Sequence, residues 1–221
     1  YSLIIMTSDR IVGARDPFGL KPLSIGKFRD SYVLASETCA FDTIGAEFLR
    51  DVEPGEIVVV DANGLNTIKK DSQPRHLCLF ESLYFSRPDS RVDGKSIYLS
   101  RNEAGRILAR EHPVDADIVI GAPDSGIVAA IGYAEESKIP YAEGIIKNRY
   151  VGRTFIQPTQ ELRDQGVMIK LNALKENIEG KRVILVDDSI VRGTTIKRTV
   201  EMLKKAGAKE VHVRISSPPV T

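Results

Sequence analysis

The sequence contains no tryptophan, and aromatic residues make up only 6% of its 221 residues. Proteins that bind single-stranded nucleic acids stack the bases on aromatic rings, so this shortage argues against that class. Two cysteines are too few for a disulfide scaffold and indicate a reducing, cytoplasmic environment. No apolar run reaches the roughly 18 residues of a membrane span, and no signal peptide opens the sequence, so we expect no membrane association.

The sequence also lacks an excess of charge of either sign. Lysine and arginine total 31 and the acidic residues 30, which leaves a net charge of +1. Proteins that bind nucleic acids or membrane surfaces carry a basic excess or a basic face, so we expect neither partner. With 42% hydrophobic and 28% charged residues, the chain has enough apolar side chains for a folded core.

The first part of the chain has the pattern of short strands joined by tight turns. We expect strands over residues 1–6, 11–14, 22–26, 32–35, 57–60 and 65–68 and one short helix over 38–44. Asn63-Gly64 is a strong hairpin signal. Strands with such short connections pair antiparallel, so we predict a meander.

After about residue 72, strand-like and helix-like segments alternate. The strands are expected over residues 117–121, 141–146, 182–186 and 210–216, and the helices over 96–111, 125–137, 167–177 and 194–206. All-apolar strands such as residues 183–186 are typical of a parallel sheet covered on both faces. We therefore predict an α/β (α+β overall) protein with domains at residues 1–72 and 73–221, joined at the polar segment 71–75.

The most informative segment is VILVDDSIVRGTT, residues 183–195. Asp187 and Asp188 follow a buried strand at its carboxyl end, where open α/β sheets bind ligands. Two adjacent carboxylates can accept hydrogen bonds from vicinal hydroxyls or help to hold Mg²⁺. Gly193 allows a turn, and the helix that begins at Thr194 and Thr195 offers N–H groups and hydroxyls to a phosphate. Helix capping alone would explain one Asp or Thr of this set, but not all of them together. The whole set indicates a binding site for a ribose 5-phosphate.

This segment resembles the phosphoribosyl pyrophosphate (PRPP) motif of the type I phosphoribosyltransferases. The resemblance implies that Asp187 and Asp188 face the ribose hydroxyls and Mg²⁺. It also implies that five further residues surround the 5-phosphate, namely Ser189, Arg192, Gly193, Thr194 and Thr195.

A second strand and turn, IVIGAPDSG at residues 118–126, fits the same substrate. Its small residues can present backbone N–H groups to pyrophosphate, and it resembles the pyrophosphate loop of that family. The resemblance places Asp124 at PRPP and Ser125 near both PRPP and Mg²⁺. Taken alone, Pro-Asp-Ser is ordinary turn and helix-start chemistry.

The polar stretch over residues 147–166 is too long for a simple connection and is typical of a lid. Residues 147–182 hold eight basic residues against four acidic ones, a local surplus of four positive charges. Positioned cations stabilise a departing pyrophosphate. We choose Lys147, Tyr150, Arg153 and Lys170 as the catalytic, phosphate-contacting set. A solvated surface explains Arg163, Lys175 and Lys181 equally well.

Three strings together resemble the family of glutamine-dependent PRPP amidotransferases: KNRYVGRTFIQP at 147–158, LVDDSIVRGTT at 185–195 and YFSRPDS at 84–90. Residues 16–26 and 35–42 resemble the later part of a class II glutaminase domain with an N-terminal nucleophile. The resemblance implies transfer of glutamine-derived ammonia to C1 of PRPP, which yields 5-phosphoribosylamine, glutamate and pyrophosphate in purine biosynthesis. It also implies feedback inhibition by purine nucleotides and a homo-oligomer.

The sequence departs from this family at its start, because Tyr1 stands where the family has its nucleophilic cysteine. We therefore expect a fragment, truncated at both ends, that does not hydrolyse glutamine. Cys39, in a helix-like segment, is expected in the core. Cys78 matches a [4Fe–4S] ligand of one branch of the family, but an apolar-flanked cysteine also suits a core, and both roles stay open.

Two other functions remain as alternatives. A phosphoribosyltransferase fold can serve a non-catalytic regulator that senses PRPP, but such a protein needs neither a basic lid nor glutaminase-like segments. A salvage transferase that acts on a purine or pyrimidine base is disfavoured by the same glutaminase-like segments. We treat His76, His112 and His212 as structural, because their spacing suits no metal site.

Overall fold

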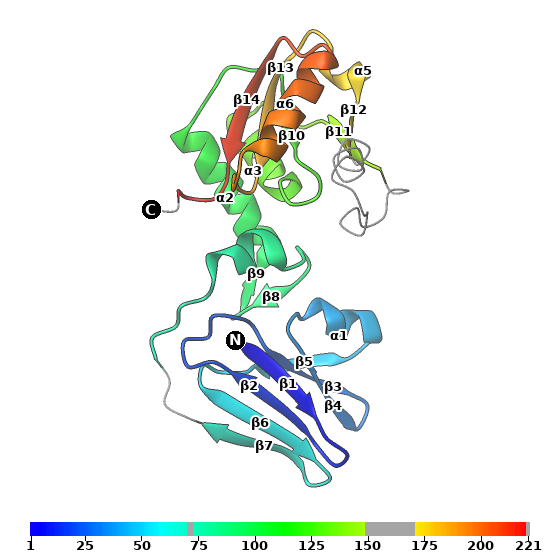
Figure 1. Cartoon of the computed structure of the whole chain (residues 1–221), viewed down its shortest axis with the longest axis vertical. Coiled ribbons are helices and arrows are strands. Elements are labelled where there is room, and N and C mark those ends of the chain that lie inside the picture. Colours follow the sequence, from blue (N-terminus) through cyan, green and yellow to red (C-terminus); the bar gives the residue numbers. More distant parts are fainter. Residues whose placement is uncertain (70–72, 149–170, 220–221) are drawn as a thin grey trace. The chain divides into compact units, whose positions relative to one another are not determined.

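The computed structural model describes residues 1–69, 73–148 and 171–219. The chain forms two compact units, Tyr1–Ser100 and Arg101–Thr221, and the helix α2, Ile97–Glu111, contains the division (Figure 1). The domain boundary expected at residues 72 and 73 stays a prediction. Within the described ranges, no helix is both long and apolar enough to cross a membrane.

The first unit contains two main antiparallel sheets, so the single predicted meander is wrong. One sheet has the strand order β1-β2-β6-β7 and the other the order β4-β3-β5 (Figure 1). The strands are β1 Ser2–Met6, β2 Ile11–Arg15, β3 Ser24–Phe28, β4 Ser31–Ala35, β5 Glu47–Asp51, β6 Glu56–Asp61 and β7 Gly64–Lys69. The individual strands were predicted except for β5, but β2 pairs with β6 and not with β3.

The reason for this pairing is burial that the local pattern does not reveal. Leu23, Ile25, Val52 and Val58 are fully buried together in one core. A meander follows only short connections, whereas this core joins segments that are far apart in the sequence. The expected short helix is present as α1, Cys39–Ile44, and the Cys39 side chain is buried as predicted.

The later part of the first unit holds short elements that the sequence pattern did not predict. They are the π-helix η1 Glu81–Phe85 and the two-residue strands β8 Arg91–Val92 and β9 Lys95–Ser96. The hairpin turns at Asp93-Gly94, where both residues have positive φ angles, of 48° and 75°. Elements this short carry too few residues for a recognisable period.

The second unit is built on a parallel sheet of order β10-β13-β14, as the sequence predicted. The strands are β10 Ile118–Gly121, β13 Arg182–Asp187 and β14 Glu210–Ile215, and the other helices are α3 Ile127–Ser137, α5 Lys175–Ile178 and α6 Thr194–Lys205. Ile184 and Val186 pack with residues of α2 and α3, whereas Val183 and Leu185 pack with the α6 side. Helices therefore cover both faces of the sheet (Figure 1).

Two predicted elements in this unit need correction. The strand expected over residues 141–146 is only β11, Ile145–Lys147, although Tyr141 forms an isolated parallel bridge with Val119. In the segment expected to be helix-like, Leu171–Ala173 is the strand β12 and pairs antiparallel with β11. Leu171 and Ala173 both turn towards the α6-side core, which is the two-residue period of a strand.

Candidate active site

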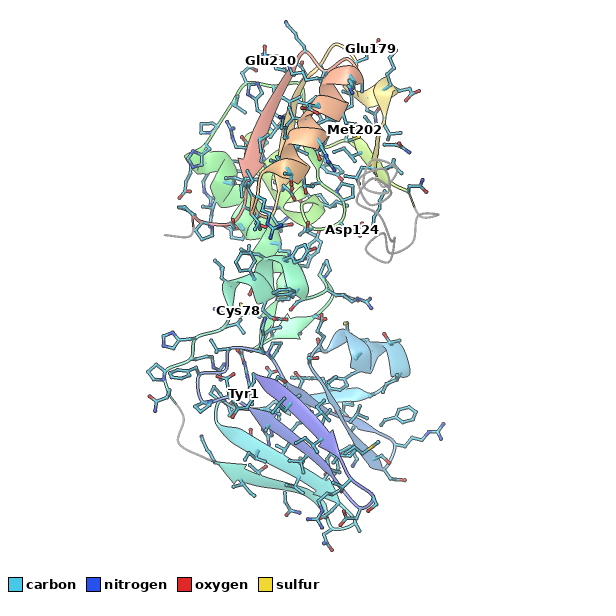
Figure 2. All side chains as sticks on the ribbon, in the orientation of Figure 1. Tyr1, Cys78, Asp124, Glu179, Met202 and Glu210 are labelled. Carbon is cyan, nitrogen blue, oxygen red and sulfur yellow. The ribbon has the colours of Figure 1, made fainter. Side chains whose placement is uncertain are left out.

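Two loops meet at the carboxyl-end edge of the parallel sheet. Gly121, the last residue of β10, pairs in register with Val186 near the end of β13, so the loops after these strands begin side by side. Figure 2 shows Asp124 at this end of the unit and Glu179 and Glu210 at the opposite end. The carboxyl ends of parallel strands are where open α/β sheets bind ligands.

Direct contacts hold the loop between β10 and α3, residues 122–126, against the end of β13. We call it the first loop. The Ala122 N–H donates a hydrogen bond of 2.8 Å to the Val186 carbonyl oxygen. A β carbon at Gly126 would lie 2.3 Å from that same oxygen and 3.1 Å from the Asp187 α carbon. Only glycine permits this approach, which holds the loop that carries Asp124 and Ser125 against the end of β13.

The acidic pair lies at the end of β13 and is largely shielded from solvent. Asp188 is buried and Asp187 is half-buried. The Asp188 N–H donates to the Asp187 carboxylate at 2.9 Å, and the Ser189 hydroxyl donates to the Asp188 carboxylate. Burial raises the pKa of Asp187 to about 6, and the Asp188 charge adds to this rise. Among the described residues, no lysine or arginine forms an ion pair with either carboxylate.

The two residues that follow β14 hold the backbone of the pair. The N–H groups of Ser216 and Ser217 donate to the carbonyl oxygens of Asp187 and Asp188 at 3.0 and 2.9 Å. These hydrogen bonds hold the backbone of the pair, and the carboxylate oxygens are the groups that can bind a ligand. Such oxygens suit vicinal hydroxyls or a hard cation.

The loop after the acidic pair leads into α6 with an open helix start. Gly193 has φ of 74° and is the N-cap of α6, where no side chain forms a capping hydrogen bond. The first N–H groups of a helix have no partner within the helix and can bind an anion. Arg192, Thr194 and Thr195 are exposed around this position. The sequence-based prediction of a glycine turn followed by a helix start is confirmed.

Lys147, at the end of β11, is the one member of the predicted catalytic set within the described residues. Its Nζ atom lies 2.5 Å from Oδ2 of Asp124. This contact joins the first loop to the predicted basic set and was not predicted, because the two residues are 23 positions apart in the sequence with no shared motif. Tyr150, Arg153 and Lys170 lie outside the described residues.

The described residues contain no group of three or more His, Cys, Asp or Glu side chains that could hold a metal ion, so they do not form a complete metal site by themselves. Cys78 lies in the first unit, half-buried, and its N–H donates to the Leu20 carbonyl oxygen at 3.0 Å. Its side chain neighbours the Lys21 ammonium, which pairs with Glu81 at 2.9 Å.

Comparisons with known proteins agree with this geometry. Residues 99–216 match the phosphoribosyl transferase domain family. Over the whole chain, the sequence is 56% identical to an amidophosphoribosyltransferase of Archaeoglobus fulgidus and 57% identical to one of Bacillus subtilis, covering 48% and 46% of those proteins. The chain thus spans about half the length of the curated relatives that it matches.

Solved structures give the same result. A structure described as the allosteric regulatory enzyme of purine biosynthesis matches the whole chain and 48% of its own chain, with 56% identity and a TM-score of 0.92. The glutamine PRPP amidotransferase of Bacillus subtilis, in complex with ADP and GMP, matches the whole chain and 49% of its own chain, with 56% identity and a TM-score of 0.91.

Proposed function

Because the chain belongs to the phosphoribosyl transferase domain family, we propose that it binds PRPP and acts as an amidophosphoribosyltransferase. The reaction is transfer of glutamine-derived ammonia to C1 of PRPP, with release of pyrophosphate and glutamate. The observation that carries the proposal is the meeting of two loops, one around Asp124 and one around Asp187, at the carboxyl-end edge of the parallel sheet. Relatives 51–59% identical along the chain bear the amidophosphoribosyltransferase name.

In this proposal, the ribose 5-phosphate is bound by the end of β13, the loop that follows it and the start of α6. Asp187 and Asp188 accept hydrogen bonds from the ribose hydroxyls and orient the sugar as positive charge develops at C1. The first N–H groups of α6 and the hydroxyls of Thr194 and Thr195 bind the 5-phosphate, since the helix start is uncapped by any side chain. Ser189, Arg192 and Gly193 complete this phosphate site.

The first loop and Lys147 are proposed to bind the pyrophosphate group. Backbone N–H groups near Asp124 and Ser125 and the Lys147 ammonium offer hydrogen bonds to its oxygens. Fixed cations and donors stabilise the charge that develops on the leaving group. On sequence grounds, Tyr150, Arg153 and Lys170 belong to the same set, which would exclude water when it closes.

Mg²⁺ fits the residues at this edge of the sheet. The ion is commonly held by one or two carboxylates together with substrate phosphates and water, so a complete protein cage is not required. Asp187 and Asp188 provide two carboxylates without a cationic partner among the described residues, and Ser125 adds a hydroxyl on the facing loop. When bound, the ion would neutralise charge on the pyrophosphate oxygens.

The cysteines of these 221 residues cannot complete a [4Fe–4S] cluster on their own. Such a cluster needs four thiolates, whereas the sequence has two cysteines. Cys39 is buried in α1, where its Sγ atom lies 3.9 Å from the Glu37 carboxylate. Cys78 could be one ligand only if cysteines outside these 221 residues supplied the rest, so no step of the reaction is assigned to a cluster.

Other parts of the proposal concern partners of the whole protein. The segments at residues 16–26 and 35–42 support an attached glutaminase activity that delivers ammonia. The complex of the Bacillus subtilis relative with ADP and GMP supports regulation by purine nucleotides. We also propose a homo-oligomer, and the two free cysteines support a cytoplasmic location.

The test is an assay of the full-length protein with PRPP and Mg²⁺ and either glutamine or ammonia as the nitrogen donor. We expect 5-phosphoribosylamine and pyrophosphate in equal amounts with both donors. A protein that binds PRPP but forms neither product would be a sensor, and one that consumes PRPP only with an added base would be a salvage enzyme. Either result would overturn the proposed function.

A further inference from the structure

The ion pair between Lys147 and Asp124 joins two segments of the candidate site. Lys147 ends β11, whereas Asp124 lies in the loop between β10 and α3, and the two charged atoms are 2.5 Å apart. The side chains are 53% and 72% exposed. Within the described ranges, neither side chain has another hydrogen bond or ion pair. Among the described residues, the contact therefore depends only on these two groups, and it can break there without disturbing a larger network.

The surroundings of Asp124 make its negative charge unfavourable for an anionic ligand. Its loop is held against the end of β13 by the Ala122 hydrogen bond and by the close approach of Gly126 to Val186. Asp187 is the last residue of that strand, and Asp188 follows it directly. Three carboxylates thus belong to the two loops where a pyrophosphate is proposed to bind, and Lys147 is the cation that pairs with one of them.

From this arrangement we infer that Asp124 is a positioning residue that holds Lys147 in the ligand-free protein and releases it when pyrophosphate binds. The inference rests on the proposed function, because it takes the anion to be the pyrophosphate group of PRPP or the released product. It assigns Asp124 a role that opposes binding, although the backbone of its loop contributes to binding.

The energetics favour such an exchange. An exposed ion pair contributes little to stability, so the Asp124 contact breaks easily. Pyrophosphate carries several negative charges and attracts the ammonium more strongly than one carboxylate does. After the exchange, the Asp124 carboxylate remains near the anion and repels it. Both effects weaken the binding of pyrophosphate, which favours its release as a product.

A double-mutant cycle tests this role by measuring the affinity of the full-length protein for pyrophosphate with Mg²⁺ by titration calorimetry. The variants are Asp124→Asn, Lys147→Met and the pair. We expect Asp124→Asn to tighten binding and Lys147→Met to weaken it. Asp124→Asn raises the affinity for pyrophosphate by some factor in each background. This factor should be about two- to fivefold larger with Lys147 present than with Lys147→Met, since fivefold corresponds to an ion pair of ~1 kcal/mol.

The control is Glu143→Gln, which removes an exposed charge four positions before Lys147 and should leave the affinity unchanged. Equal gains in both backgrounds would overturn the inference, because Asp124 would then act by repulsion alone. Weaker binding by Asp124→Asn would overturn it as well. Failure of the proposed function is distinguishable: the coupling would be present, but the protein would form no 5-phosphoribosylamine. Wild-type protein that binds no pyrophosphate would contradict both.

Discussion

Gly126 lies so close to the carbonyl oxygen of Val186 that a β carbon on the glycine would stand 2.3 Å from that oxygen. This contact fixes the distance between the loop of Asp124 and the strand that carries Asp187. The relative position of the two loops therefore depends on this glycine together with the Ala122 hydrogen bond to the same oxygen. Since catalysis by positioning is sensitive to displacements of about 1 Å, the contact matters for activity as well as for packing.

We predict that Gly126→Ala pushes the first loop away from β13 and lowers kcat/KM for PRPP by on the order of 100-fold. Gly132→Ala is a matched control: it overpacks the same helix α3 against Asn102, where a β carbon would lie 1.9 Å from the carbonyl oxygen, but away from the loops. The control should lower thermal stability while folded molecules keep the wild-type kcat/KM. Equal kcat/KM values for the two variants would contradict the prediction.

We expect the Arg15 guanidinium to stabilise the first unit. It is fully buried and donates to both Asp93 carboxylate oxygens at 2.8 and 3.0 Å and to the carbonyl oxygens of Lys21, Val52 and Gly19. Removing one member of a buried ion pair costs about 3–5 kcal/mol. Arg15→Met should therefore greatly accelerate hydrogen exchange in peptides that cover β2 and β3.

Arg10→Met is the control for this variant, because Arg10 pairs with Asp9 at the surface and both side chains are about half exposed. It should leave the exchange rates unchanged. Arg15→Met with protection equal to that of the wild type would show that Arg15 does not hold the unit together.

We expect the ion pair between Arg50 and Glu56 to make the stability of the first unit depend on pH. Burial by itself would raise the pKa of Glu56, but the hydrogen bonds from Arg50 at 2.7 and 2.9 Å and from the Glu53 N–H outweigh it and lower this pKa. The stabilisation is therefore present above the unfolded-state pKa of roughly 4.3 and lost as pH falls through the lower folded-state value.

Urea unfolding at several pH values checks this prediction. Glu56→Gln should lower the urea midpoint at pH 7, and the difference from the wild type should shrink as the pH falls below roughly 4. Glu47→Gln, at an exposed position in β5, should show no such dependence. A constant difference between Glu56→Gln and the wild type at all pH values would contradict the assignment.

The parallel sheet and the phosphate loop could be predicted because local signals agree there. The apolar run before Asp187 is long enough for a buried strand, and Gly193 stands where the backbone needs φ of 74°. The hairpin at Asn63-Gly64 formed for the same reason. In each case, the residues that determine the conformation are adjacent in the sequence.

The remainder depends on contacts between distant residues. β2 pairs with β6, which is far away in the sequence, and the core that joins β3 with β6 is equally invisible in the short connections. The burial of Arg15 has no local signal, because its partner Asp93 is 78 residues away. The contact between Asp124 and Lys147 likewise has no local signal. Sequence reasoning thus placed the acidic pair at the end of a strand but missed the ion pair between Asp124 and Lys147.

The most direct test of the central claim is ammonia-dependent PRPP turnover by the full-length protein with Asp187→Asn and Asp188→Asn combined. The control combines Glu179→Gln and Glu210→Gln, which removes two carboxylates at the opposite end of the same unit (Figure 2). We predict that the first variant loses PRPP turnover while the control keeps it. Near-normal turnover by the Asp187→Asn and Asp188→Asn variant would contradict the assignment of this edge of the sheet as the active site.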